Sequence, residues 1–166
     1  MKRNFLKFTA ASVIAFGLLS TSFLVSVSAQ DKSNLQGEGT RFEGTWNVRV
    51  TLRNCLTGDE IRSFDSVTTF MSGGTLMDST SGIPQALKTP GQGVWSHKTG
   101  NKYGFSFKSF SFDPTGNYTG WTVIRQEAVL NLRGTAYESK GTSEVYTPNG
   151  ILVFTGCSTT TAARFE

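Results

Sequence analysis

The chain has 166 residues, of which 16 are Lys or Arg and 12 are Asp or Glu. Three of the basic residues lie among the first seven positions, in a segment that we expect to be removed, which leaves 13 basic against 12 acidic residues. This near balance gives no electrostatic reason to expect nucleic acid or an anionic membrane as a partner. The sequence holds one His and no zinc, calcium or phosphate-loop spacing, so we expect no metal and no cofactor.

The N-terminal segment has the pattern of a secretory signal peptide. Lys2 and Arg3 supply positive charge, residues 8–27 carry no charge, and Val-Ser-Ala at 27–29 places small residues at a cleavage site. We therefore expect a signal peptide over residues 1–29 and a secreted or periplasmic protein that has no membrane contact after cleavage. The alternative is an uncleaved anchor, because the uncharged run is long enough to span a bilayer.

The rest of the sequence predicts a lead-in and one β-domain. Residues 30–43 are polar and contain glycine, so we expect a flexible lead-in before a domain over residues 44–166. From Trp46 to Arg53 apolar and polar side chains alternate, which is typical of a strand with one face in the core. Turn residues such as Asn-Gly separate further segments of this kind, so we expect short hairpins between them. The eight expected strands cover residues 46–53, 61–71, 75–77, 93–98, 103–112, 118–130, 136–146 and 151–163.

Two segments depart from this regular pattern. The aromatic side chains of the fifth expected strand change parity across Lys108-Ser109, which predicts a β-bulge there. Alternatively, Phe110 and Phe112 pack on the outside of the sheet. Residues 78–92 form a long connection that contains apolar side chains, and it either packs over the mouth of a barrel or forms a plain surface loop.

The two cysteines favour a closed barrel. Cys55 ends the first expected strand and Cys157 lies in the last, and an isolated pair in an oxidising compartment is expected to form a disulfide. If the cysteines lie opposite each other, Trp46 faces Glu166, with Arg164 within reach of its ring. A bridge between first and last strands suits a single antiparallel up-and-down barrel of about eight strands, although a Greek-key sandwich could also join them.

The start and the end of the domain resemble the calycin superfamily, which includes the lipocalins and the avidins. Gly-Thr-Trp at 44–46 is similar to the Gly-x-Trp that opens their first strand, and Arg164 matches the late Arg that packs across the Trp in lipocalins. The resemblance implies that Trp46 and Arg164 are structural residues at the base of the barrel. It extends to uncharacterised secreted bacterial proteins that end in Arg-Phe-Glu, as this chain does at 164–166. The second lipocalin motif, Thr-Asp, is absent here.

The interior of such a barrel is the expected binding site. Small residues share one face of 136–146 while charged residues share the other, which leaves space beside large aromatic side chains. A cavity of this lining suits a small, mostly apolar molecule. The candidate ligand-binding residues are Trp95, His97, Phe105, Phe107, Trp121, Tyr137 and Ser139. Other side chains expected to point inward are Val48, Val50, Leu52 and Val123.

Three functions are compatible with these patterns. The first is an exported barrel that holds a small apolar ligand. The second is a barrel filled by its own side chains that acts through its surface, because aromatic residues also fill cores. The third is a barrel isomerase or cyclase, for which the sequence offers no catalytic residue: it has no Gly-x-Ser-x-Gly elbow, and its carboxylates are scattered along strands whose pattern mostly predicts solvent. The sequence predicts no oligomeric state.

Overall fold

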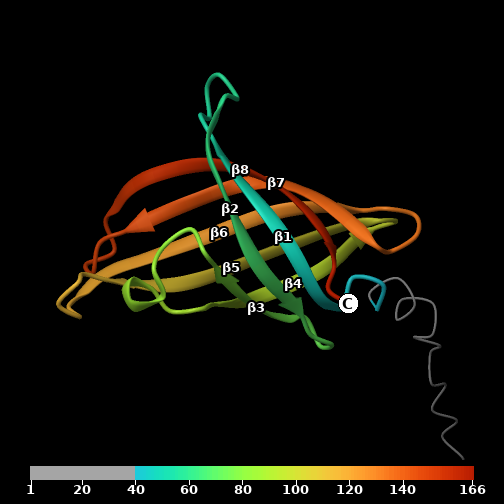
Figure 1. The fold of residues 1–166 in the computed structure, drawn as a ribbon, viewed down its shortest axis with the longest axis horizontal. Coiled ribbons are helices and arrows are strands. Elements are labelled where there is room, and N and C mark those ends of the chain that lie inside the picture. The colour runs from blue at the N-terminus through green and yellow to red at the C-terminus, as the bar shows by residue number, and fades with distance from the viewer. Residues whose placement is uncertain (1–39) are drawn as a thin grey trace, which may run out of the picture. The chain divides into compact units, whose positions relative to one another are not determined.

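Residues 40–166, the part of the chain that this computed structural model describes, form eight β-strands and one short 3₁₀ turn, η1. Each strand pairs antiparallel with the next and β8 pairs back with β1, so the sheet closes into an up-and-down barrel, which confirms the expected fold (Figure 1). The expected signal peptide, and residues 30–39 of the expected lead-in, lie outside the described residues. The elements are β1 (Gly44–Arg53), β2 (Glu60–Phe70), β3 (Thr75–Thr80), η1 (Gln85–Leu87), β4 (Gly91–Thr99), β5 (Lys102–Phe112), β6 (Tyr118–Leu130), β7 (Ala136–Tyr146) and β8 (Leu152–Arg164).

Strand β1 shows why the inward face could be predicted and the register could not. Trp46 and Val48 are buried, and the residues between and after them are exposed, as the alternation predicts. The pairing with β8 places Trp46 opposite Arg164, two residues away from the expected partner Glu166. Because side chains alternate with a period of two, a shift of two residues leaves every inward position inward.

The position of the disulfide explains why the register of β1 and β8 differs by two residues from the expected one. Cys55 and Cys157 are bonded, with their Cα atoms 5.2 Å apart, as expected. However, Arg53, the last residue of β1, is the residue that pairs with Cys157, and Cys55 lies two positions further on, in the β1–β2 connection. The bond therefore ties the β1–β2 hairpin to the last strand. The hairpin and the β3–β4, β5–β6 and β7–β8 connections lie at one end of the barrel, called the mouth; the remaining turns lie at the other end, the base.

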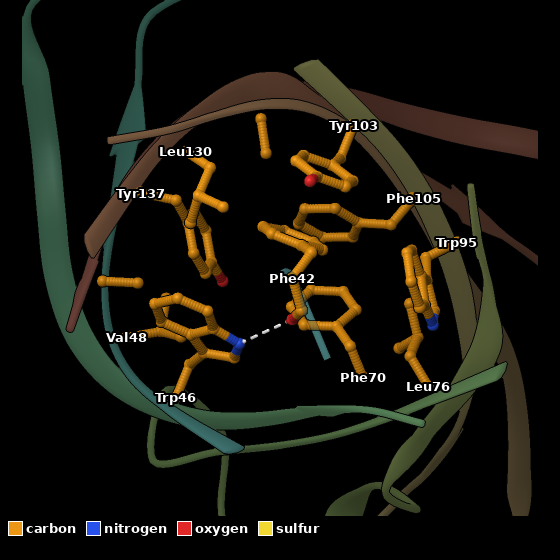
Figure 2. Close-up of a cluster of buried hydrophobic side chains, with 12 residues drawn as sticks. Phe42, Trp46, Val48, Phe70, Leu76, Trp95, Tyr103, Phe105, Leu130 and Tyr137 are labelled. Atoms are coloured by element: carbon orange, nitrogen blue, oxygen red, sulfur yellow. Dashed lines mark hydrogen bonds between the residues drawn. The ribbon is translucent and has the colours of Figure 1, made fainter. Parts of the chain in front are cut away.

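A cluster of large apolar side chains fills the base. Its centre is Phe42, whose ring lies 4.3 Å from the rings of both Phe70 and Tyr103 and whose side chain is 0% exposed. Figure 2 shows this ring surrounded by side chains from several strands. Trp46 Nε1 donates a hydrogen bond of 3.1 Å to the Phe42 carbonyl (Figure 2). Phe42 falls within residues 30–43, the expected flexible lead-in, but its burial makes it part of the barrel core.

Arg164 fixes the chain segments that lie next to this base cluster. Its guanidinium lies 4.3 Å from the Trp46 ring and donates hydrogen bonds to the carbonyls of Arg41, Glu43 and Gly134. Gly44 makes the close approach possible, because a Cβ at this position would lie 2.5 Å from Arg164 Nη1 and the backbone has a φ of 116° that L side chains rarely adopt.

Strands β5 and β6 correct two expectations. Strand β5 pairs with β6 without a shift from Lys102 to Ser111, so the bulge expected at Lys108-Ser109 is wrong, and Phe110 points outward as in the alternative. Trp121 and Val123, expected inside, lie on the outer face of β6, and Thr122 and Ile124 point inward instead. Outside the barrel the Trp121 ring stacks on the Tyr146 ring, with 5.3 Å between the ring centroids. Lys108 Nζ lies 4.2 Å from the centroid of the Trp121 ring. These contacts shelter the indole without burying it in the core.

Candidate ligand-binding site

A cavity of 240 Å³ lies inside the barrel, between the base cluster and the mouth. Apolar side chains from five strands form much of its lining. They include Val50, Leu52, Phe64, Phe107, Ile124 and Phe154. Other side chains of the lining are polar and lie closer to the base cluster. They include Ser66, Thr68, Asp78, Gln126, Ser158 and Thr160. Further polar side chains line the cavity nearer the mouth, among them Arg62, Ser109, Ser111 and Thr122, so the lining is mostly apolar with polar groups along its length.

The connection between β3 and β4 contributes to the cavity. It is pinned to β5, because Thr89 N donates to the Phe110 carbonyl at 3.0 Å and Phe110 N donates to Thr89 Oγ1 at 3.0 Å. From this connection Ile83 and Lys88 reach the cavity. Of the two readings that the sequence left open for residues 78–92, a segment that packs over the barrel mouth is therefore the one that the structure supports.

Asp78 is the most deeply placed charged group in the cavity. Its residue is 6% exposed, and its carboxylate oxygen Oδ2 accepts hydrogen bonds from Ser66 Oγ at 2.6 Å and from Thr68 Oγ1 at 2.8 Å. Burial raises the pKa of this carboxyl above its ordinary value, and the two hydroxyls and the charge of Lys88 only partly oppose that rise. Burial and the negative charge of Asp78 also raise the pKa of the Tyr137 phenol.

A second polar group lies on the opposite part of the wall. Gln126 Nε2 donates to Ser158 Oγ at 2.8 Å, and Gln126 Oε1 accepts from Ser139 Oγ at 2.9 Å. The Ser139 hydroxyl also lies 2.6 Å from Thr160 Oγ1. Because these side chains hydrogen-bond to one another, they form a network that fixes their rotamers on the inner wall.

Lys88 is a second buried charge at the cavity. Its residue is 7% exposed, and burial lowers the pKa of its ammonium while the nearby Asp78 carboxylate opposes that change. Among residues 40–166, no group lies within hydrogen-bond or ion-pair distance of this ammonium. Lys88 is nevertheless part of the cavity lining. An ammonium on so buried a residue, with no hydrogen-bond partner among residues 40–166, is costly unless something in the cavity solvates it.

The structure brings together only part of the predicted set of ligand-binding residues. Phe105, Phe107 and Tyr137 line the cavity, and Ser139 supports its lining through Gln126. Trp95 lies in the base cluster, where its Nε1 donates to the Met71 carbonyl at 2.9 Å.

His97 and Trp121 lie away from the cavity. His97 is near the base, with Nε2 2.7 Å from the Gly100 carbonyl and its ring beside Tyr103. Trp121 is on the outer face. Nothing in the geometry places either side chain against a molecule bound inside.

The two charged residues of the site, Asp78 and Lys88, are not among the residues that the sequence pattern predicts to bind a ligand. Asp78 was expected in solvent, at the start of a loop, because the third strand was expected to end at residue 77. The strand continues to Thr80, and Asp78 shares the inward face with Leu76, which is the signal that could have revealed it. Lys88 lies outside any strand, so alternation says nothing about its direction.

The fold and this site define a closed eight-stranded antiparallel barrel with an interior cavity. Comparisons with protein-family models, with curated proteins and with solved structures found no match. Within residues 40–166, no helix is long and apolar enough to span a membrane. The same residues contain no group of three His, Cys, Asp or Glu side chains arranged to hold a metal ion.

Replacing Asp78 with Asn is expected to alter how stability depends on pH. A raised pKa means that the folded barrel favours the protonated carboxyl, so the contribution of Asp78 is fully present below its unfolded pKa of about 3.9 and is lost as the pH rises through the folded pKa. Asn does not ionise. The free energy of unfolding of Asp78→Asn, measured in urea, should therefore increase relative to that of the wild type as the pH rises. If the free energy of unfolding of the variant minus that of the wild type stays constant or falls as the pH rises, Asp78 is not desolvated.

Proposed function

We propose that this protein is an exported carrier or receptor that holds one small, mostly apolar molecule inside its barrel. The observation that carries the proposal is the cavity of 240 Å³ with a mostly apolar wall and a few polar groups. Binding sites for small molecules have this composition, because apolar walls supply affinity and a few polar groups fix the orientation. A barrel that only needs to be stable gains nothing from a void, since unfilled interior volume costs stability.

The size of the cavity limits the ligand. At roughly 30 Å³ per water molecule, 240 Å³ corresponds to about eight waters. This is smaller than the pockets of drug-sized ligands, which start at about 300 Å³. The proposed ligand is therefore a compact molecule or a short chain.

Export and a calycin-like ancestry are part of the same proposal. The disulfide between Cys55 and Cys157 supports residence in an oxidising compartment. The Trp46 ring under the Arg164 guanidinium, at the base of an up-and-down barrel, supports the resemblance to lipocalins. The resemblance favours binding of a ligand inside the barrel over action through a filled one.

Filling the cavity should abolish binding. The probe is the neutral, apolar fluorophore N-phenyl-1-naphthylamine, titrated into the protein while its fluorescence is recorded. Ile124 lines the cavity from β6, so Ile124→Trp should remove saturable binding. The matched control is Val129→Trp, which places the same side chain on the outer face of the same strand, where Val129 is exposed.

The two variants separate the proposal from its rival. Binding that is lost in Ile124→Trp and kept in Val129→Trp supports a ligand inside the barrel, provided that both variants unfold cooperatively in urea. Equal binding by both variants places the probe on the surface. No saturable binding by the wild type favours a barrel that acts through its outer face.

A further inference from the structure

Resting on the proposed function, we infer that the ligand carries a hydroxyl group, which binds in the cavity between the carboxylate of Asp78 and the ammonium of Lys88. The apolar part of the molecule then lies along the wall towards the mouth. The ligand class is a small apolar alcohol or phenol.

The two oxygens of the Asp78 carboxylate differ in their hydrogen bonds. Both hydrogen bonds to this carboxylate go to Oδ2, from Ser66 and Thr68. Oδ1 accepts none from residues 40–166. Yet no fully buried side-chain oxygen or nitrogen of the described chain is left without a partner. Oδ1 must therefore face accessible space, and the space beside Asp78 is the cavity. It offers one acceptor to a bound molecule.

Lys88 is placed in a similar way to Asp78, on a buried residue that lines the cavity. Its ammonium has no partner within hydrogen-bond distance among the described residues, and it too is absent from the fully buried, unpaired atoms. It lines the same cavity and interacts electrostatically with Asp78. Lys88 therefore offers donors to the bound molecule in the same cavity as the acceptor of Asp78.

The charges of Asp78 and Lys88 limit the charge that the ligand can carry. Asp78 and Lys88 already balance each other, and both are more than nine-tenths buried. A ligand carboxylate would meet the charge of Asp78 at low dielectric, and a ligand ammonium would meet that of Lys88. A neutral group avoids both costs. A hydroxyl fits, because it accepts a hydrogen bond from an ammonium and donates one to a carboxylate.

The experiment compares ligands of similar length by displacement of N-phenyl-1-naphthylamine. The set is 1-octanol, its isomer heptyl methyl ether, octanoate and octylamine. The ether accepts a hydrogen bond but donates none. A hydrogen bond to a charged group changes affinity about tenfold to a hundredfold, so 1-octanol should bind that much more tightly than the ether. It should also bind more tightly than either charged ligand.

Variants connect this preference to the two residues. In the double variant Asp78→Asn/Lys88→Met the preference for 1-octanol over the ether should weaken towards that of an uncharged hydrogen bond while the fluorophore still binds. The matched control is Glu138→Gln/Lys140→Met, which removes one charge of each sign from exposed positions on β7 and should keep the preference. Retained fluorophore binding shows that the double variant is folded.

Each outcome bears on one of the two proposals. Equal binding of 1-octanol and the ether by the wild type, with the fluorophore bound, overturns the hydroxyl site and leaves the cavity function in place. Tightest binding of octanoate also overturns it. If the wild type does not bind the fluorophore, the four ligands are titrated directly by isothermal calorimetry, and the proposed function fails if none of them binds.

Discussion

Replacing Phe42 with Ala is expected to lower the free energy of unfolding of the barrel by about 3–5 kcal/mol, the usual cost of deleting a buried aromatic ring. The Phe42 side chain is fully buried and packs against Phe70 and Tyr103 at ring distances of 4.3 Å. Its removal leaves a void at the centre of the base, because the surrounding rings belong to different strands and cannot all close in. Unfolding in guanidinium chloride measures the loss.

Phe165→Ala is the matched control for this prediction. Phe165 is 56% exposed, so its truncation should change the free energy of unfolding by about 0.5 kcal/mol or less. A loss below about 1 kcal/mol for Phe42→Ala would contradict the placement of this ring in the core. It would restore the expectation that residues 30–43 are only a lead-in.

The double variant Cys55→Ser/Cys157→Ser is expected to lose about 4–5 kcal/mol relative to the oxidised protein. The bond closes a loop with a sequence separation of 102 residues, and in the chain-entropy model so long a loop restricts the unfolded chain strongly. Neither cysteine belongs to the buried core, so the serines themselves should cost little.

Reduction of the wild type provides the control. The unfolding midpoint of the reduced protein should approach that of the double-serine variant, which reductant should leave unchanged. Equal stability of the oxidised protein and the double-serine variant would mean that the bond does not stabilise the closed barrel.

The sequence could predict the barrel because most of its strands have one clearly polar face. In β7, Glu138 and Lys140 point outward while Tyr137 and Ser139 are buried, as the alternation predicts. In the first half of β6 both faces are apolar or neutral, so periodicity could not decide between Trp121 and Thr122. The aromatic partner Tyr146 on the neighbouring strand made the outer face acceptable for Trp121.

The charged residues of the site could not be predicted for a different reason. Charged residues are rarely buried, so the sequence favours solvent for Asp78 and Lys88. Asp78 is accommodated by the hydroxyls of Ser66 and Thr68, which lie 12 and 10 positions away in the sequence and reach it only through the pairing of β2 with β3. Phe42 is similar, because a residue that precedes the first strand has no alternation to reveal its direction.

The most direct test of the cavity function is the mass of the protein purified gently from its own host, recorded under native and then under denaturing conditions. We predict a native species heavier than the denatured chain by one small neutral molecule, whose mass identifies the ligand. The denatured mass should also be lower by about two hydrogens, because Cys55 and Cys157 are bonded. A native mass equal to the denatured mass in every preparation would contradict a ligand held inside the barrel.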